Sequence, residues 1–136
     1  MNQAFTVKHF MSAAPVTFAP EENVLDAITK LVRNRISGAP VMDAQGSLIG
    51  ILSERDCLRV TVTAAYHGDW GRPVREYMST EVQTVEADMG VVELAERFLS
   101  EPFRRYPVVE NNRLIGLISR RDILRALLQL RSSTSQ

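Results

Sequence analysis

Two copies of one short motif carry the side chains best suited to chemistry. Residues 50–56 read GILSERD and residues 116–122 read GLISRRD, so both contain Gly-x-x-Ser-x-x-Asp. A serine hydroxyl and the free backbone N–H groups at the start of a helix can hold a phosphate. A carboxylate one turn later can accept hydrogen bonds from both hydroxyls of a ribose, and glycine would let a bulky ligand approach the backbone. The combination favours a nucleoside phosphate over a bare anion.

The same motif has a purely structural interpretation. A serine followed three residues later by an acidic residue is a helix-capping pattern. Ser53 and Ser119 would then be N-caps, with Asp56 and Asp122 favourably placed beside the positive end of each helix. The glycines would serve close packing of strand and helix. A single copy would favour this interpretation, so its recurrence directs attention to the rest of the chain.

The motif belongs to a repeat that spans nearly the whole chain. With an offset of 67, residues 7, 11, 12, 17, 24, 40 and 41 are identical to their counterparts in the second copy, and after the turn near Gly46 the offset becomes 66. We predict an α/β (α+β) fold of two tandem β-α-β-β-α repeats. The repeats span residues 1–66 and 74–131, joined by a linker at 67–73 and followed by a disordered polar tail at 132–136.

The elements that position each motif follow from the apolar pattern. In the first copy, Asn23 is an expected N-cap, and its helix should end near Gly38, before a proline. Residues 40–42 and 47–52 read as a hairpin, and a second helix should run from Ser53 to about Tyr66. The second copy repeats this order. Because a unit of about 65 residues buries only a modest core, the copies should pack as a pseudo-twofold pair with related clefts between them.

Composition excludes several classes of function. The 16 basic and 16 acidic residues cancel, so overall charge does not favour nucleic acid or an anionic membrane. No apolar run is long enough to span a bilayer, and the N-terminus does not resemble a signal peptide. The single cysteine, Cys57, suits a reducing compartment, so we expect a cytoplasmic protein. His9 and His67 lack metal-ligand spacing, and Cys57 has no histidine partner, so we expect neither a metal site nor an enzyme.

Across nearly the whole chain, the repeat resembles the CBS domain, a family named after cystathionine beta-synthase. VKHFMS and VREYMS resemble the family's opening, and Gly-x-x-Ser-x-x-Asp resembles its nucleotide-binding signature. Two CBS domains in tandem form a Bateman module, a pseudo-symmetric disc with two clefts for adenosyl ligands. The resemblance implies that AMP, ADP or ATP binds, with S-adenosylmethionine or NAD(H) as further options, and that no cofactor is required.

The resemblance also implies roles for individual residues. Asp56 and Asp122 would bind ribose hydroxyls, and Ser53 and Ser119 would lie near phosphate. Thr17 and Thr84, together with the segments before Pro40 and Pro107, would line the adenine pocket. The expected ligand-binding set is Thr17, Ala39, Pro40, Ser53, Arg55 and Asp56 in the first copy, and Thr84, Arg104, Arg105, Tyr106, Pro107, Ser119, Arg121 and Asp122 in the second.

The two copies differ in charge where phosphate would bind. Arg104 and Arg105 stand where the first copy has uncharged residues, and Arg120 stands where it has Glu54. In the related AMP-activated kinase subunit, basic residues at the Arg104 and Arg105 positions bind phosphate, and guanidinium groups suit its oxygens. We predict that the Ser119–Asp122 site binds phosphorylated ligands more tightly. A solvated surface is the alternative role for these arginines.

These observations predict a non-catalytic regulatory module that senses adenine nucleotides, as in energy sensing, and signals to an unidentified protein partner. The family forms face-to-face dimers, so we expect a homodimer through the helices at 57–66 and 123–130, whose apolar residues could alternatively fill the core. A structural or interaction protein with vestigial clefts, stabilising a partner without ligand control, is the alternative function. An enzyme that turns over a nucleotide would need a base, nucleophile or metal cluster that the sequence does not display.

Overall fold

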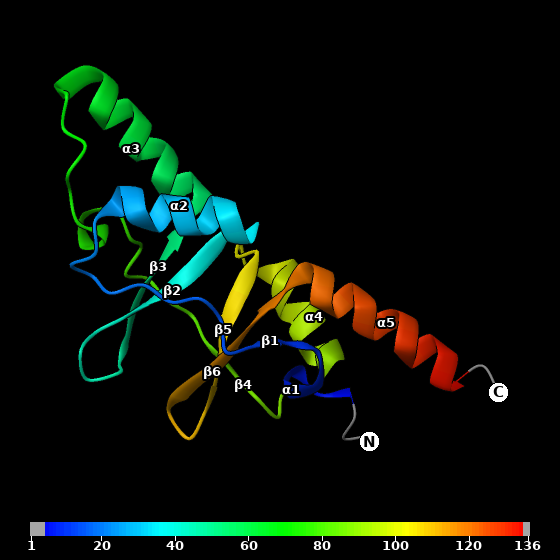
Figure 1. Ribbon diagram of the computed structural model, residues 1–136. Coiled ribbons are helices and arrows are strands. Elements are labelled where there is room, and N and C mark those ends of the chain that lie inside the picture. The colour runs from blue at the N-terminus through cyan, green and yellow to red at the C-terminus, as the bar shows by residue number, and fades with distance from the viewer. Residues whose placement is uncertain (1–4, 135–136) are drawn as a thin grey trace. The chain divides into compact units, whose positions relative to one another are not determined.

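The computed structural model describes residues 5–134, which form two compact units of mixed α and β structure (Figure 1). Unit 1 combines residues 5–15 with residues 83–134, and unit 2 consists of residues 16–82. The predicted α+β fold class is confirmed. None of the helices among the described residues is long and apolar enough to cross a membrane.

Unit 2 consists of a two-stranded sheet and two long helices. Strands β2 (Gly38–Met42) and β3 (Leu48–Ser53) pair antiparallel, as the sequence predicts for a hairpin. The turn between them is closed by Asp43, whose side chain accepts hydrogen bonds from two following backbone N–H groups. Helix α2 (Val24–Asn34) precedes the hairpin and α3 (Glu54–His67) follows it, and the short 3-10 helix η2 (Val74–Glu76) completes the unit.

Helix α2 begins where the sequence predicts and ends earlier. The Asn23 side chain accepts a hydrogen bond from the backbone N–H of Leu25 at 2.8 Å, as an N-cap does. The predicted end near Gly38 is wrong, because Arg35 adopts a left-handed conformation with φ of 54° and terminates the helix. Gly38 already belongs to β2. The sequence gives no clear signal for a left-handed arginine. The prediction therefore relied on Gly38 and Pro40, which lie beyond the true end of the helix.

Unit 1 contains a four-stranded sheet in the order β1-β6-β5-β4. Strands β5 (Arg105–Glu110) and β6 (Arg113–Ser119) form the antiparallel centre, with β1 (Ser12–Ala13) antiparallel to β6 and β4 (Val85–Glu86) parallel to β5. Helices α4 (Val91–Ser100) and α5 (Arg120–Thr134) lie side by side (Figure 1).

Two predicted features of the repeats differ in the structure. The expected first strand of the first copy is reduced to a single parallel bridge between Phe18 and Val41, whereas the second copy forms β4. Helix α5 continues to Thr134, so residues 132–134 of the expected tail are helical. Residues 135–136 of that tail lie outside the described residues.

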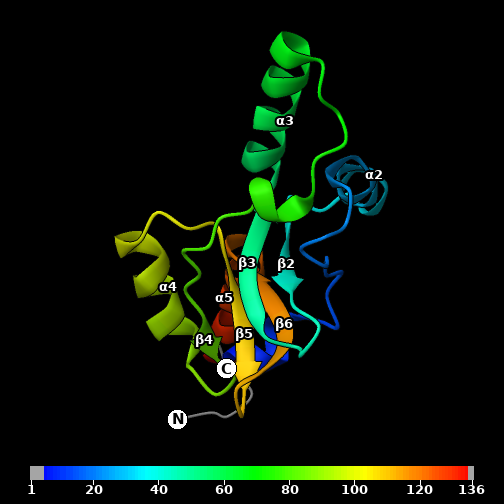
Figure 2. The ribbon, with the colours of Figure 1, turned by 90° about the vertical axis from the view of Figure 1, so that its left-hand side faces the viewer.

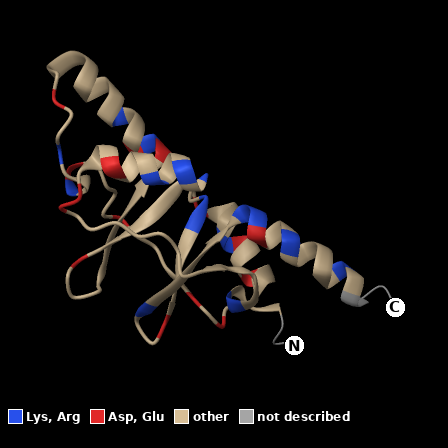
Figure 3. Ribbon diagram, viewed as in Figure 1, with Lys and Arg blue, Asp and Glu red and all other residues tan. Residues whose placement is uncertain are grey.

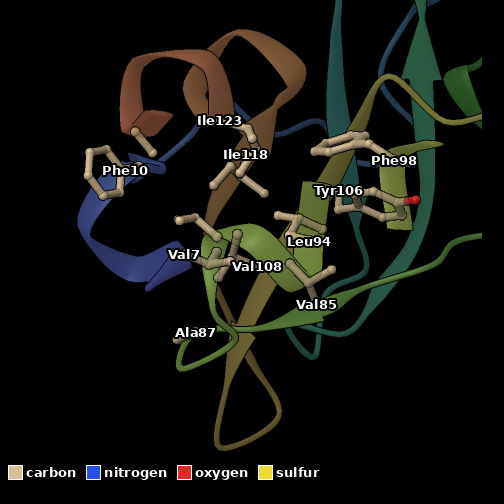
Figure 4. Packing of buried hydrophobic residues seen from close by; sticks show 12 residues of the cluster. Val7, Phe10, Val85, Ala87, Leu94, Phe98, Tyr106, Val108, Ile118 and Ile123 are labelled. Atoms are coloured by element: carbon tan, nitrogen blue, oxygen red, sulfur yellow. The ribbon is translucent and has the colours of Figure 1, made fainter. Parts of the chain in front are cut away.

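The core of unit 1 joins side chains from both ends of the chain (Figure 4). Val7 and Phe10 come from α1 (Val7–Phe10), and they pack with residues of α4, α5 and the sheet such as Leu94, Val108 and Ile118. Most members of this cluster are fully buried, and each such side chain contributes about 1.5–3 kcal/mol. This burial fixes the first residues of the described chain against the second motif.

The segments that lead each repeat therefore complete the compact unit containing the other repeat's motif. We call residues 7–12 and 74–79 the leading segments. A Cβ atom added to Gly116 would lie 2.5 Å from Met11 Sδ and 2.7 Å from the carbonyl oxygen of Ser12. The equivalent Cβ at Gly50 would lie 2.7 Å from Met78 Sδ and 2.9 Å from the carbonyl oxygen of Ser79. The expectation that glycine admits a ligand is corrected, because a leading segment fills the space.

Candidate functional site

In unit 1 the predicted ligand-binding segments meet at one end of the sheet. Strand β6 ends at Ser119 and α5 begins at the next residue. Ser119 lies opposite Arg105 in the register of β5 and β6, so the basic segment and the motif are neighbours. Thr84 directly precedes β4, which runs parallel to β5 with Val85 opposite Val108. The sequence-predicted set for the second copy is thus brought to one place within a single unit.

Unit 2 assembles its own set in the same way. Gly38 lies opposite Ser53 in the register of β2 and β3, and α3 begins after Ser53. Thr17 directly precedes Phe18, whose backbone N–H donates to the carbonyl oxygen of Pro40 at 3.0 Å. Thr17 is exposed, whereas Thr84 of the second set is half-buried. The second set therefore offers the more enclosed surroundings at this position.

Both motifs form capping boxes, as the structural interpretation of the sequence predicts. In unit 1, Asp122 Oδ2 accepts hydrogen bonds from the backbone N–H of Ser119 at 2.9 Å and from its hydroxyl at 3.1 Å. In unit 2, Asp56 Oδ2 accepts from the backbone N–H of Ser53 at 2.8 Å and from its hydroxyl at 2.9 Å. Asp122 is buried and Asp56 half-buried. Capping and ligand binding are compatible, because the cap fixes the carboxylate at the positive helix end that would hold a phosphate.

An arginine one turn after each aspartate holds the second carboxylate oxygen. Arg125 Nη2 lies 3.1 Å from Asp122 Oδ1 and donates to the carbonyl oxygen of Phe10 at 2.9 Å. Arg59 Nη2 lies 3.0 Å from Asp56 Oδ1 and donates to the carbonyl oxygen of Tyr77 at 2.8 Å. The functional interpretation of the sequence did not single out these arginines. Their recurrence at the same offset from the aspartate was the signal that could have found them.

Four arginines gather where α5 begins in unit 1 (Figure 3). The backbone N–H of Arg120 donates to the carbonyl oxygen of Arg104 at 3.3 Å, which places the first turn of α5 beside the start of β5. Arg104, Arg120 and Arg121 are exposed, and Arg105 is half-buried. Positive charge is therefore concentrated beside a helix N-terminus that itself favours anions.

The corresponding place in unit 2 lacks this concentration of charge. The backbone N–H of Glu54 donates to the carbonyl oxygen of Ser37 at 2.9 Å, which is the same contact made by different residues. Glu54 and Arg55 are both exposed in the first turn of α3. A negative and a positive side chain there offset one another, so an anionic ligand finds less attraction than in unit 1.

Besides Asp122, four residues of the predicted set are buried, and two of them belong to the hydrophobic cores. Ala39 and Tyr106 are completely buried members of the two cores, and Pro40 and Pro107 are also buried. The side chains of Ala39 and Tyr106 are part of the cores, so any contribution of these two residues to a ligand would come from the backbone.

Tyr106 belongs to a polar network that sequence reasoning missed. Its hydroxyl donates to Glu101 Oε1 at 2.9 Å, and the Arg97 guanidinium lies 4.6 Å from the centre of its ring. Arg97 also donates to the carbonyl oxygen of Thr84 at 2.9 Å. Burial, followed by the hydrogen bond to Glu101, raises the pKa of Tyr106 to about 12, and the hydrogen bond from Tyr106 lowers the pKa of Glu101. The network fixes Thr84 at the edge of the site.

The helices predicted as dimer surfaces are partly core and partly exposed. Ile123 and Cys57 are buried, as the core interpretation requires. Leu124, Leu127 and Leu128 on α5 expose more than half of their surface, and Leu99 on α4 is 89% exposed. A groove of about 520 Å³ lies between α4 and α5 and is lined mainly by apolar side chains. Unit 2 also exposes apolar residues on its helices, namely Val32, Leu58, Val62 and Tyr66.

Among residues 5–134, no three metal-ligating side chains cluster closely enough to hold a metal.

Comparison with known proteins supports the resemblance seen in the sequence. The family described as "CBS domain" matches residues 7–62 and 74–129. The CBS domain-containing protein YhcV of Bacillus subtilis is 30% identical over 119 residues, which cover 87% of this chain and 82% of that protein. A crystal structure of CBSX2 in complex with AMP is 30% identical with a TM-score of 0.81, covering 93% of this chain and 98% of that one. The CBS domain pair of MJ0100, solved with 5-methylthioadenosine and S-adenosylmethionine, is 25% identical with a TM-score of 0.77, covering 92% of this chain and 97% of that one.

The share of each relative that this chain spans varies widely. It spans 66% of a 17.7 kDa protein of Acidianus ambivalens, which is 31% identical and matches 82% of this chain. It spans only 14% of the A-adding tRNA nucleotidyltransferase of Geobacter sulfurreducens, which is 31% identical and matches 92% of this chain. The matching region therefore occurs both in small proteins and as a minor part of an enzyme.

Proposed function

Because this chain belongs to the CBS domain family, we propose that it is a non-catalytic regulatory module that binds adenosyl ligands at its two Ser–Asp motifs. Asp56 and Asp122 would accept the ribose hydroxyls, and the helix N-termini beside Ser53 and Ser119 would face phosphate. The observation that carries this proposal is the capping box, present in both units, that holds a carboxylate at the start of a helix. The CBS pairs solved with AMP and with S-adenosylmethionine support the class of ligand.

We propose that the motif of unit 1 is the tighter site for a phosphorylated ligand. Arg104, Arg105 and Arg121 lie beside its helix N-terminus, whereas unit 2 presents Glu54 in the first turn of α3. Charge-assisted hydrogen bonds to phosphate are about twice as strong as neutral ones. AMP, ADP or ATP would therefore prefer unit 1. S-Adenosylmethionine or another adenosyl ligand without phosphate would discriminate less between the two motifs.

Calorimetric titration with AMP and with adenosine tests both parts of this proposal. Asp122→Ala should abolish the tighter binding of AMP, whereas Asp56→Ala should leave it in place. Arg104→Ala should weaken AMP about tenfold and leave adenosine unchanged, because it removes one charge-assisted contact to phosphate. Arg113→Ala is the charge-matched control, because Arg113 is exposed at the opposite end of β6. Absence of AMP binding by the wild-type protein, or equal effects of the two arginine variants, would contradict the proposal.

Signalling would follow from differential affinity of the ligand for two states of the module. We propose a homodimer through the exposed apolar residues of α3 and α5, the two helices that the sequence predicts as dimer surfaces, and of α4 beside α5. Such a dimer would link ligand sites in two copies of the chain. A further protein partner would read the ligand state. The buried free thiol of Cys57 fits the reducing conditions of the cytoplasm, where we place the protein.

The alternative is an interaction protein that stabilises a partner without ligand control. The arginines beside Ser119, which helix capping does not require, favour ligand binding over this alternative. A thermal-shift comparison with AMP, ATP, NADH and S-adenosylmethionine separates them, because a ligand at a hundred times its Kd stabilises the folded state by about 2.7 kcal/mol. A vestigial site would give no shift with any of these compounds.

A further inference from the structure

The guanidinium groups of Arg59 and Arg125 each contact two parts of the molecule, the motif aspartate of their own helix and a leading segment. In each arginine a single nitrogen, Nη2, forms an ion pair with the motif aspartate and donates a hydrogen bond to a backbone carbonyl of a leading segment. Arg125 links Asp122 to Phe10 in unit 1, and Arg59 links Asp56 to Tyr77 in unit 2. The same arrangement arises twice from independent parts of the chain, which argues against an accidental surface contact.

The contacts of the aspartate show what this arrangement does to a ligand site. A carboxylate offers about four acceptor positions. Ser119 occupies two on Asp122 Oδ2 through its backbone N–H and hydroxyl, and Arg125 Nη2 forms an ion pair with Oδ1 at 3.1 Å. Both oxygens are therefore fixed in direction before any ribose arrives. The rotation of the carboxylate is set by the arginine on one side and by the helix cap on the other.

The other end of the contact is a leading segment with its own hydrogen bonds. Phe10 is the last residue of α1, whose Val7 and Lys8 backbone N–H groups donate to the carbonyl oxygens of Met89 and Ala87 at 2.8 and 3.0 Å. Met11 fills the space beside Gly116. A displacement of this segment would move the acceptor of Arg125, and with it the arginine's hold on Asp122.

We propose that Arg125 and Arg59 are positioning residues that couple ribose binding at each motif to the order of the leading segment beside it. This inference rests on the proposed binding of an adenosyl ligand at the aspartates. Coupling is reciprocal, so a segment that preorganises the site must itself be stabilised by the ligand. Occupancy of the unit 1 site is thereby transmitted to residues 7–12, and occupancy of the unit 2 site to residues 74–79.

Residue-by-residue amide hydrogen exchange by NMR, with and without AMP, tests the coupling. In the wild-type protein, saturating AMP should slow exchange of the Val7, Lys8 and Met11 amides about tenfold, within the usual range of coupling between sites. Arg125→Ala should weaken AMP binding by a similar factor. Saturating AMP should then no longer slow exchange of the leading segment, although it still occupies the site. A merely structural arginine would not remove this ligand-dependent protection.

Arg59→Ala is the matched control, because it removes the same charge from the equivalent position of the other unit. It should preserve the AMP response of residues 7–12 and alter exchange of residues 74–79. A ligand-free arm tests the contact itself, since Asp122→Asn and Arg125→Ala should each speed exchange at Val7 and Lys8, and the double variant should add little.

The possible failures are distinguishable. If AMP binds the wild-type protein and Asp122→Ala abolishes binding, but Arg125→Ala retains full affinity and full protection of residues 7–12, the coupling is refuted and the proposed function stands. If the wild-type protein binds none of AMP, ATP, NADH and S-adenosylmethionine, the proposed function fails and the coupling to ribose fails with it. Additive effects of Asp122→Asn and Arg125→Ala in the ligand-free arm would also refute the contact as the link.

Discussion

Replacing Gly116 by alanine tests whether the leading segment is seated where the motif begins. The added Cβ would lie 2.5 Å from Met11 Sδ and 2.7 Å from the Ser12 carbonyl oxygen. The methionine sulfur is the end of a flexible side chain and can move, but the Ser12 carbonyl belongs to β1 and is held in register with β6. The substitution must therefore push the strand away from Gly116.

The expected cost combines two effects. Overpacking a tight contact costs about 1–3 kcal/mol, and each weakened hydrogen bond between β1 and β6 costs about 0.5–1.5 kcal/mol. A total of about 2–4 kcal/mol would lower Tm by roughly 6–14 °C in a chain of this size. Urea denaturation and a thermal melt measure this loss directly, and amide exchange at residues 7–13 shows where it acts.

Two further variants make the experiment discriminating. Gly71→Ala is the control, because a Cβ there would meet no atom within 4 Å, so its stability should change by less than about 1 kcal/mol. Met11→Ala combined with Gly116→Ala should restore only part of the stability, since the Ser12 carbonyl still meets the new methyl group. Equal stabilities of the Gly116 and Gly71 variants, or full rescue by Met11→Ala, would refute the reasoning.

Four further predictions concern ionisation and assembly. The raised pKa of Tyr106, about 12, means that stability present below pH 10 is lost as pH rises toward 12, and Tyr106→Phe should flatten this alkaline loss in pH-dependent melts. The lowered pKa of Glu101 means that its contribution is present above pH 4.5 and is lost as pH falls below that value; Tyr106→Phe should reduce this acid sensitivity too. Burial raises the pKa of Cys57 to about 11, so its alkylation by iodoacetamide at pH 8 should be at least about a hundredfold slower than that of a free thiol with pKa 9.0, and rapid labelling would contradict its burial. Leu99→Asp should convert the proposed homodimer to monomer in sedimentation analysis with little change in monomer stability, because the side chain is 89% exposed; an unchanged sedimentation coefficient would exclude this face as the interface.

Local features of the site were predictable from the sequence because they depend on residues a few positions apart. The capping boxes at Ser53 and Ser119 follow from an i,i+3 pattern, and the structure contains both. The hairpin of β2 and β3 follows from two apolar runs around a polar turn. The doubled pattern also led to the family, which the comparison with known proteins confirms.

Long-range partners were not predictable in this way. Gly50 and Gly116 have the same sequence surroundings, so nothing local determines which leading segment packs against which glycine. Arg97 reaches the Thr84 carbonyl, and Arg125 reaches the Phe10 carbonyl, only because the tertiary fold brings these segments together. Tyr106 belongs to the predicted ligand-binding set, but its side chain is buried in the core, and no local sequence pattern indicates this burial. Tyr106 lies in β5, the strand labelled in Figure 2, and its ring packs against Phe98, as Figure 4 shows, and against Phe103.

The exchange of leading segments makes each repeat dependent on the other for completion. Residues 74–134 alone would lack α1 and β1, which would leave one edge of β6 unpaired and open to other strands. A lone repeat could recover a leading segment only from a second molecule, as in domain swapping. Joining two repeats in one chain makes this exchange intramolecular, at an effective concentration on the order of millimolar. Loss of one leading segment would therefore disturb the packing around the Ser–Asp motif of the other repeat.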